Sequence, residues 1–405
     1  MRPTNILYAQ HIGWHFKKHW QVQGKRVHRE TGAIAELLRY NLDIKSAKKV
    51  VNPSPARQDV HIIGPVVETV VENDSHQKWH NETCRNYSDS NVLLGGLAQA
   101  QVLTNTIEIR RFPRQIENAI ENQQIPSAVD RRIRNAILDS HVFHALQTKL
   151  PKTKLVDRPA FNIPRTYGIA SERCNRLLVN KLLFEIEKLA GQSVTSRRRL
   201  LDNVTLNTSL TRKKDLVNFA ITTDKMITSI SPLGAISDKV EGTIPDLFPM
   251  ESTISIPKKH IYTGENYYSL RTEITSTHPQ TVITYCKKGA TNLHRSVLTP
   301  SQFESRTMLT AFAAAISRAK HLYGITTGTL QTPVVVQSVQ TDGRTFHFGI
   351  FQLNTFDISS NVQNYWFHRN CFDLFLECGM KAGRPYLEGY NREIFCILNS
   401  FYHNI

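Results

Sequence analysis

The alternation of hydrophobic and polar residues is clearest in the last third of the chain. Residues 281–285 alternate as a strand does. The run Thr299-Pro300-Ser301-Gln302 then predicts the start of a helix. Thr is a favoured N-cap, Pro is favoured at the first helical position, and Gln at the third position completes a capping box. This helix is expected to stop at Gly324.

A β-hairpin is predicted over residues 334–355. Its tip is Asp342-Gly343, a preferred two-residue turn of type I′, and such a turn would pair Val339 with Phe346. Both faces of the hairpin are mostly apolar, which is typical of strands that are covered on two sides. We therefore expect the hairpin to be a central element of a buried core.

Helical periodicity is visible in four segments of the first half of the chain. They begin at Ala33, at Pro113, at Ser127 and at Ser171, and the last is expected to end before Gly191. Residues 222–257 are rich in Ser, Thr, Pro and Gly, which predicts a long loop. The predicted fold class is α+β, with a helical, basic N-terminal half and a C-terminal antiparallel-sheet unit with packed helices.

Charge is distributed unevenly over the 405 residues. The whole chain has 50 Lys and Arg against 34 Asp and Glu, a formal net charge of +16. Residues 149–214 contain 15 Lys and Arg against 5 Asp and Glu, so they carry +10 of that charge. Residues 332–405 are nearly neutral, with 5 basic and 6 acidic residues. A basic excess of this kind favours a polyanionic partner, such as nucleic acid.

Basic clusters along the chain are the candidates for contact with RNA. They comprise Arg131, Arg132, Arg134, Arg197, Arg198, Arg199, Arg212, Lys213 and Lys214. A guanidinium group donates two parallel hydrogen bonds to a phosphate. No RNA-recognition motif or zinc finger accompanies the clusters, so we expect contacts with the phosphate backbone rather than reading of bases. The alternative interpretation is an ordinary solvated basic surface.

The N-terminal segment has the features of a targeting sequence. No acidic residue precedes Glu30, and residues 1–29 are basic and amphipathic, as mitochondrial transit peptides are. The alternative is a basic arm of the mature protein. No stretch reaches the roughly 18 apolar residues of a membrane-spanning helix. The expected organisation is a transit peptide (1–29), a basic rRNA-contacting region (30–257) and a near-neutral α+β domain (258–405) that holds the hairpin at 334–353.

The chain lacks the common signatures of enzymes. It contains no Walker A sequence, no GxGxxG, no GxSxG and no HExxH. Two sets have helical metal-ligand spacing, namely His11, His15 and His19, and His76, His80 and Cys84. The first lies in the expected transit peptide, and Asn, Asp and Ser around the second disfavour a helix. We therefore predict no catalytic, cofactor-binding or metal-binding residue, and interpret His347 as a hydrogen-bonded strand histidine.

One family resemblance is carried by the helix and the hairpin. The segments "AAAISRAKHLYG" (313–324) and "TPVVVQSVQTDGRTFHFGIFQLNT" (332–355) resemble the mitochondrial ribosomal protein family numbered thirty-seven in the large subunit. The segments "KKHIYTGENYY" (258–268) and "TYCKKGATNLHR" (284–295) fit the preceding region of that family in order and spacing. The resemblance covers about residues 258–357.

The resemblance implies a structural component of the mitochondrial ribosome, in the matrix, that supports mitochondrial translation without a cofactor or catalysis. Its implied partners are the large-subunit rRNA and other mitochondrial ribosomal proteins, including a paralogous family historically named small-subunit protein thirty. Two other functions remain open from the residues alone. One is a protein-docking adaptor that binds no RNA, and the other is a mitochondrial enzyme acting on RNA or a small molecule through His347 or Asp342.

Overall fold

One mixed β-sheet organises the second of two units in the computed structural model. The structure describes residues 32–42, 44–45, 75, 77, 83–150, 152, 166–212, 215–236, 242–247, 256–260, 266–268, 270, 276–286, 297–324, 328–358 and 360–404. The first unit spans residues 1–67, and helix α2 (Ala33–Arg39) is described within it. The second spans residues 68–405. The predicted transit peptide lies outside the described residues.

The sheet has eleven strands in the described part of the chain. They are β1 (Thr83–Ser88), β2 (Thr106–Ile109), β5 (Arg198–Arg212), β6 (Asp215–Ser229), β7 (Lys258–His260), β8 (Tyr267–Tyr268), β9 (His278–Tyr285), β10 (Thr329–Thr341), β11 (Thr345–Thr355), β12 (Asn364–His368) and β13 (Phe372–Asp373). The main order is β2-β12-β11-β10-β9-β6-β1-β7, and β5 pairs with β6. Strands from both sides of residue 257 thus belong to one sheet.

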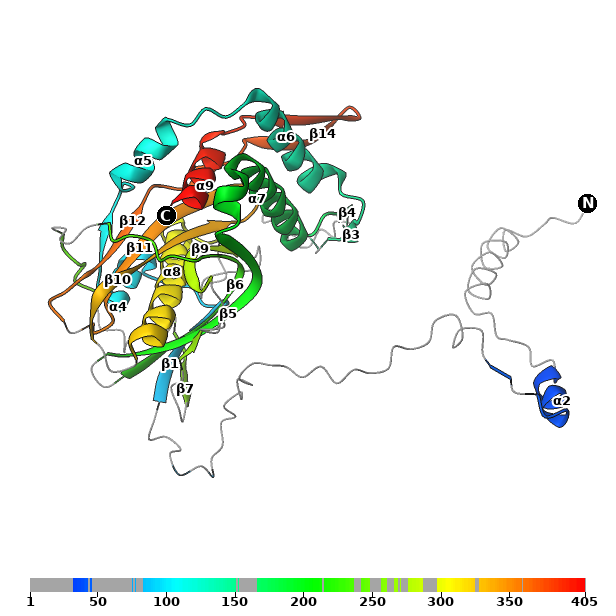
Figure 1. Ribbon diagram of the computed structural model, residues 1–405, viewed down its shortest axis with the longest axis horizontal. Helices are drawn as coiled ribbons and strands as arrows, with labels where there is room; N and C mark the ends of the chain where they lie inside the picture. Colours follow the sequence, from blue (N-terminus) through cyan, green and yellow to red (C-terminus); the bar gives the residue numbers. More distant parts are fainter. Residues whose placement is uncertain are drawn as a thin grey trace, which may run out of the picture. The chain divides into compact units, whose positions relative to one another are not determined.

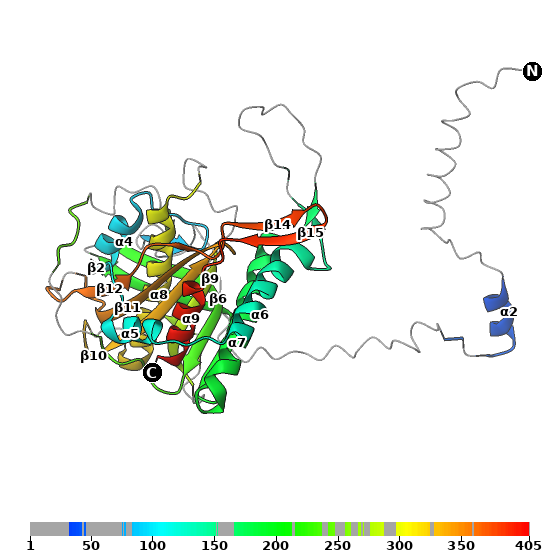
Figure 2. The same ribbon diagram turned by 90° about the horizontal axis from the view of Figure 1, so that it is seen from above.

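Helices cover both faces of this sheet (Figures 1 and 2), and the prediction of an α+β fold is confirmed. One face carries α4 (Gly96–Thr104) and α8 (Pro300–Tyr323), and the other carries α5 (Arg114–Glu121), α6 (Ser127–Leu138), α7 (Ser171–Thr195) and α9 (Glu393–His403). Each face has an aromatic core. Phe312 lies between Phe219 and Phe351 under α8, and Phe401 contacts Phe348 under α9.

Smaller elements complete the second unit. A π-helical turn, η1 (Asp139–Phe143), follows α6, and two short ladders pair β3 (Thr148–Lys149) with β4 (Tyr167–Gly168) and β14 (Glu377–Lys381) with β15 (Arg384–Glu388). The β14–β15 hairpin contacts α6. Among the described residues, no helix has the length and apolar character that crossing a bilayer requires.

The predicted ends of helix α8 are confirmed. The Thr299 hydroxyl accepts a hydrogen bond from the Gln302 backbone N–H, and the Gln302 side chain accepts one from the Thr299 N–H, at 3.3 and 3.1 Å. Pro300 occupies the first helical position, and Gly324 ends the helix with a φ of 85°. Local sequence rules were sufficient here because caps depend on residues a few positions apart.

The hairpin forms as predicted, but its predicted register is wrong by two residues. Val339 pairs with Phe348, and Thr341 pairs with Phe346. The two-residue turn is replaced by a longer connection, because the Asp342 carboxylate accepts hydrogen bonds from the backbone N–H groups of Arg344 and Thr345, at 2.9 and 2.8 Å. A shift of two residues keeps every side chain on its face, so the expected buried core is still obtained.

The β5–β6 hairpin was not predicted. Sequence reasoning placed the arginine clusters in a loop-rich region and started a long loop at Thr222, whereas β6 continues to Ser229. The signal was an alternation in "VTLNTSL", where Val204, Leu206 and Leu210 are buried. Polar Thr, Asn and Ser between them, together with basic residues at both ends, obscured this period of two.

Candidate nucleic-acid interface

Two basic segments of the sequence lie side by side in helices α6 and α7. Arg132 of α6 pairs with Glu185 of α7, with 2.6 Å between Nε and Oε2. Lys181 of α7 pairs with Asp139, directly after α6, at 2.5 Å. The later position, Asp139, pairs with the earlier residue of α7, so the two helices run antiparallel. The surface that they present to solvent carries basic side chains from both helices.

Three of the predicted RNA-contact residues are exposed without a described role in the fold. Arg131 lies on α6, Arg197 lies between α7 and β5, and Arg199 lies on β5; all three side chains are exposed. We call these three residues the outer arginines. Their guanidinium groups are accessible to a phosphate backbone. Arg212 is the last residue of β5, and Lys213 and Lys214 lie outside the described residues.

Three other predicted residues have partners within the chain. Arg132 binds Glu185 but keeps 46% of its side-chain surface exposed. Arg134 lies over the ring of Tyr390, 5.0 Å from its centroid. Arg198 donates hydrogen bonds to two backbone carbonyl oxygens at the C-terminal end of α9, those of Tyr402 (3.2 Å) and Asn404 (2.7 Å). Arg198 therefore attaches the last helix to β5.

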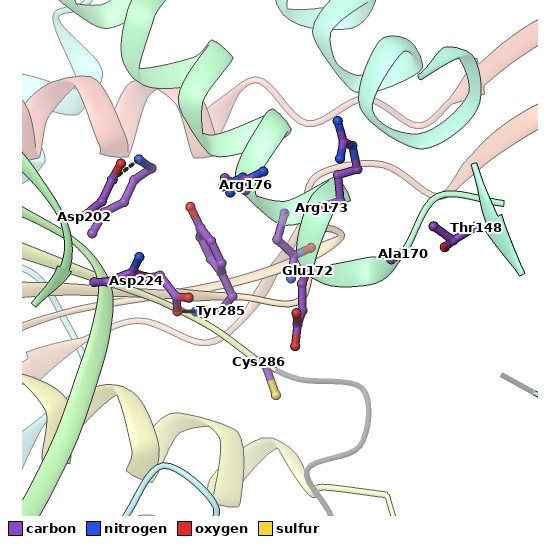
Figure 3. A pocket seen from close by; sticks show the side chains of 12 residues that line it. Thr148, Ala170, Glu172, Arg173, Arg176, Asp202, Asp224, Tyr285 and Cys286 are labelled. Atoms are coloured by element: carbon purple, nitrogen blue, oxygen red, sulfur yellow. Dashed lines mark hydrogen bonds and ion pairs between the residues drawn. The ribbon is translucent and has the colours of Figure 1, made fainter. Parts of the chain in front are cut away.

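A cavity of about 490 Å³ opens at the beginning of α7 (Figure 3). It is lined by residues from α7, the β5–β6 hairpin and the end of β9, including Arg173, Arg176, Asn175, Lys225 and Tyr285. Figure 3 shows the ring of Tyr285 between Arg176 and the Asp202–Lys225 pair. That pair has 2.5 Å between Nζ and Oδ1. The Asp224 carboxylate accepts a hydrogen bond from the Tyr285 backbone N–H at 2.6 Å.

The cavity contains polar groups without partners in the described chain. The Asn175 side chain is 1% exposed, and neither its Nδ2 nor its Oδ1 has a hydrogen-bond partner there. The Tyr285 hydroxyl is in the same situation. Burial, followed by the negative charge of Asp224, raises the pKa of Tyr285, so this hydroxyl stays protonated. Sequence reasoning missed this site, although Arg173 and Arg176 at the start of a predicted helix were a visible signal.

His347 is a hydrogen-bonded strand histidine, as predicted, but it is fully buried. Its Nδ1 lies 2.8 Å from Thr307 Oγ1, and its Nε2 lies 3.2 Å from Nδ1 of His368. The Nε2 of His368 lies 3.0 Å from the Glu108 carboxylate. Burial and then the neighbouring His368 hold the pKa of His347 well below its ordinary value. His347 does not line the cavity at α7.

The Glu108 carboxylate, which ends this series of hydrogen bonds, belongs to strand β2. The hydrogen bond from His368 is the largest influence that lowers the pKa of Glu108, to about 2, so Glu108 is ionised at neutral pH. Arg110 also binds Glu108, with 2.7 Å between Nε and Oε1. Sequence reasoning did not find this group because 260 positions separate Glu108 from His368.

Known proteins with similar sequences were found, although no family model matches the chain. The rat large ribosomal subunit protein mL37 is 29% identical over 276 residues, which cover 66% of this chain and 60% of the rat protein. The mouse protein of that name is 28% identical over 290 residues, covering 70% and 64%. The cattle protein is 33% identical over 171 residues, covering 41% and 40%.

These similarities support assignment of the chain to the mL37 family. The alignments span less than two thirds of the rat and mouse mL37 proteins. The relatives are named as proteins of the large ribosomal subunit.

Proposed function

We propose that the chain is a structural constituent of the large subunit of the mitochondrial ribosome, where it binds rRNA and supports mitochondrial translation. The observation that carries this proposal is its similarity to the rat and mouse mL37 proteins. The excess of basic residues is a second, independent argument, because a net charge of +16 favours a polyanionic partner.

The RNA contacts are assigned to the α6–α7 layer. The outer arginines Arg131, Arg197 and Arg199 would donate hydrogen bonds to phosphate oxygens, and each phosphate that they neutralise would release condensed counterions. The cavity at the start of α7 adds the guanidinium of Arg176, an exposed residue. Affinity from such contacts falls as salt concentration rises.

Neighbouring proteins are assigned to the nearly neutral C-terminal part. Protein interfaces are depleted of charge at their centre and enriched in exposed apolar side chains such as methionine. On the β14–β15 hairpin and directly before it, Met380 is 52% exposed and Leu376 is 61% exposed. The paralogous small-subunit-thirty family is among the partners that we propose for this region.

Sedimentation tests the proposed function directly. The full-length chain, carrying an affinity tag, is expressed in mitochondria, and the lysate is separated on a sucrose gradient at physiological salt. We expect the tagged chain to co-sediment with the large ribosomal subunit. Recovery of the folded chain only at the top of the gradient would overturn the proposal.

A docking adaptor that binds no RNA is the second candidate. It is favoured by the internal partners of Arg132, Arg134 and Arg198, because side chains that stabilise the fold have less freedom to bind phosphate. Under this alternative, association with the subunit would not depend on the outer arginines.

Replacement of the outer arginines separates the two candidates. In the triple variant Arg131→Gln, Arg197→Gln, Arg199→Gln, we expect dissociation from the subunit at a lower KCl concentration. A plot of log affinity against log salt concentration should have a slope that is less steep by about 1 for each phosphate that is no longer neutralised. The matched control neutralises Lys258, Lys259 and Arg114, which are exposed on β7 and α5. Unchanged association in the first variant, or an equal weakening in the control, would contradict specific RNA contact by these arginines.

A further inference from the structure

Three side chains with metal-ligating atoms meet between α8 and the sheet. They are Glu304 of α8, His347 of β11 and His368 at the end of β12, and each offers one ligand atom within 4.8 Å of the others. Both histidines are buried, at 0% and 1% exposure, and Glu304 is partly exposed. The cluster is separate from the α6–α7 layer to which RNA contacts are assigned.

The two imidazole rings approach each other through one nitrogen atom each. Nε2 of His347 and Nδ1 of His368 face each other 3.2 Å apart. Two nitrogens that ligate a tetrahedral zinc ion at ~2.0–2.1 Å lie about 3.3 Å from each other. The observed separation is close to this value.

The outer nitrogen of each ring has a hydrogen-bond partner. Nδ1 of His347 contacts the Thr307 hydroxyl, and Nε2 of His368 contacts the Glu108 carboxylate. Histidines that bind metals almost always hydrogen-bond through their second nitrogen to a carboxylate, a carbonyl or water, which fixes the ring and its tautomer. The pair His368–Glu108 has this carboxylate–histidine arrangement.

The charge around the histidines also favours a cation. Two carboxylates lie near His368: that of Glu108 is 3.0 Å from its Nε2, and that of Glu304 belongs to the cluster, while the Arg110 partner of Glu108 keeps 75% of its side chain exposed. Divalent binding would place positive charge between these carboxylates. Imidazole nitrogen with one carboxylate oxygen is a donor set of zinc sites, whereas calcium and magnesium prefer oxygen ligands alone.

We propose that Glu304, His347 and His368 bind one zinc ion, with Glu108 and Thr307 orienting the two histidines. The ion links the N-terminal part of α8 to the adjacent strands β11 and β12, so its role is to stabilise the packing of this helix on the sheet. This inference does not depend on the proposed ribosomal function.

Metal analysis of the purified full-length chain tests the proposal. The chain is loaded with zinc chloride and dialysed against metal-free buffer, and its zinc content is measured by plasma mass spectrometry. We expect about one zinc per chain. A chelator should lower the melting temperature, and added zinc should restore it, because a ligand of the folded state raises stability.

Substitution of Glu304 provides the residue-specific test. Glu304 is partly exposed, so Glu304→Gln is expected to keep the fold, checked by circular dichroism, and to weaken zinc affinity by at least about tenfold. Glu187→Gln, on the outer helix α7, is the matched control and should bind zinc as the unaltered chain does. The proposal is overturned if the unaltered chain retains no zinc, or if Glu304→Gln binds zinc as tightly as the control.

Discussion

At the scale of single residues, Gly349 faces the indole ring of Trp366 and has no room for a side chain. Gly349 lies on β11, and Trp366 lies across the ladder on β12. A Cβ added to Gly349 would lie 2.2 Å from two atoms of the indole ring. The ring is fully buried and also contacts Phe351, so it has little room to move away. Glycine is therefore required for packing at this position.

The substitution Gly349→Ala should lower the free energy of unfolding by about 1–3 kcal/mol, the usual cost of overpacking a well-packed core. Urea unfolding of the full-length chain measures the change. Gly234→Ala is the control, because an added Cβ there meets no atom within 4 Å, and we expect a change within about 0.5 kcal/mol. Equal effects at the two positions would show that the contact with Trp366 is unimportant.

Residues whose roles depend on near neighbours were predictable, and the others were not. Thr299, Gln302 and Gly324 satisfy backbone groups of their own helix, so their pattern was sufficient. The surroundings of His347 depend on Thr307 and His368, from two other elements, and no local spacing indicates them. For the same reason, the sequence did not indicate the hydrogen bonds from Arg198 to backbone carbonyl groups near the C-terminus.

At the scale of elements, helix α8 is buried along most of its length, even at polar positions. Lys320, in its last turn, is 8% exposed, and its Nζ donates a hydrogen bond to the Ser209 carbonyl oxygen on β5. Burial lowers the pKa of Lys320 from 10.5 to about 8. Between these two pH values the unfolded chain holds a proton that the folded chain has released, so raising the pH there stabilises the fold.

The variant Lys320→Met should lack this pH dependence. Between pH 7 and pH 10 the unaltered chain loses the buried charge of Lys320, so its free energy of unfolding should rise by about 2 kcal/mol relative to that of the variant. Urea unfolding at a series of pH values measures this difference. Lys188→Met serves as the control, since Lys188 is exposed on α7. Parallel pH profiles for all three proteins would refute the argument.

Elements of the sheet were predicted in proportion to how clearly their own sequence alternates. Both strands of the β10–β11 hairpin were predicted, but their register was not. The expected type I′ turn is not formed, because the Asp342 carboxylate binds the backbone N–H groups of Arg344 and Thr345. The mixed composition of β5 and β6 does not indicate strands, and each is stabilised by its pairing with the other. Their ladder runs from Arg198 and Ser229 to Arg212 and Asp215.

At the scale of the whole molecule, the sheet is assembled from strands of both the N-terminal and the C-terminal part of the chain. β9 and β12, from the C-terminal part, pair with β6 and β2, from the N-terminal part. The core on the face of α9 likewise combines α6 and α7 with β10 and β11. The charged and the neutral parts of the sequence therefore share one hydrophobic core.

A fragment limited to residues 258–405 should not fold alone, because β9 would be separated from β6 and the core under α9 would be missing three helices. We expect no cooperative thermal transition in circular dichroism. The control fragment, residues 68–405, contains the complete second unit and should melt cooperatively. A sharp transition in the shorter fragment would show that the expected domain boundary at residue 257 separates independent folding units.

The parallel pairing of β2 with β12 has a consequence for the time at which the protein matures. During synthesis from the N-terminal end, Glu108 emerges 260 positions before His368, the residue that it binds. At roughly 5–20 residues per second, this interval is on the order of 13–52 s. During that interval β2 lacks its partner strand β12, and exposed apolar surface with an unpaired strand edge makes a growing polypeptide prone to aggregate.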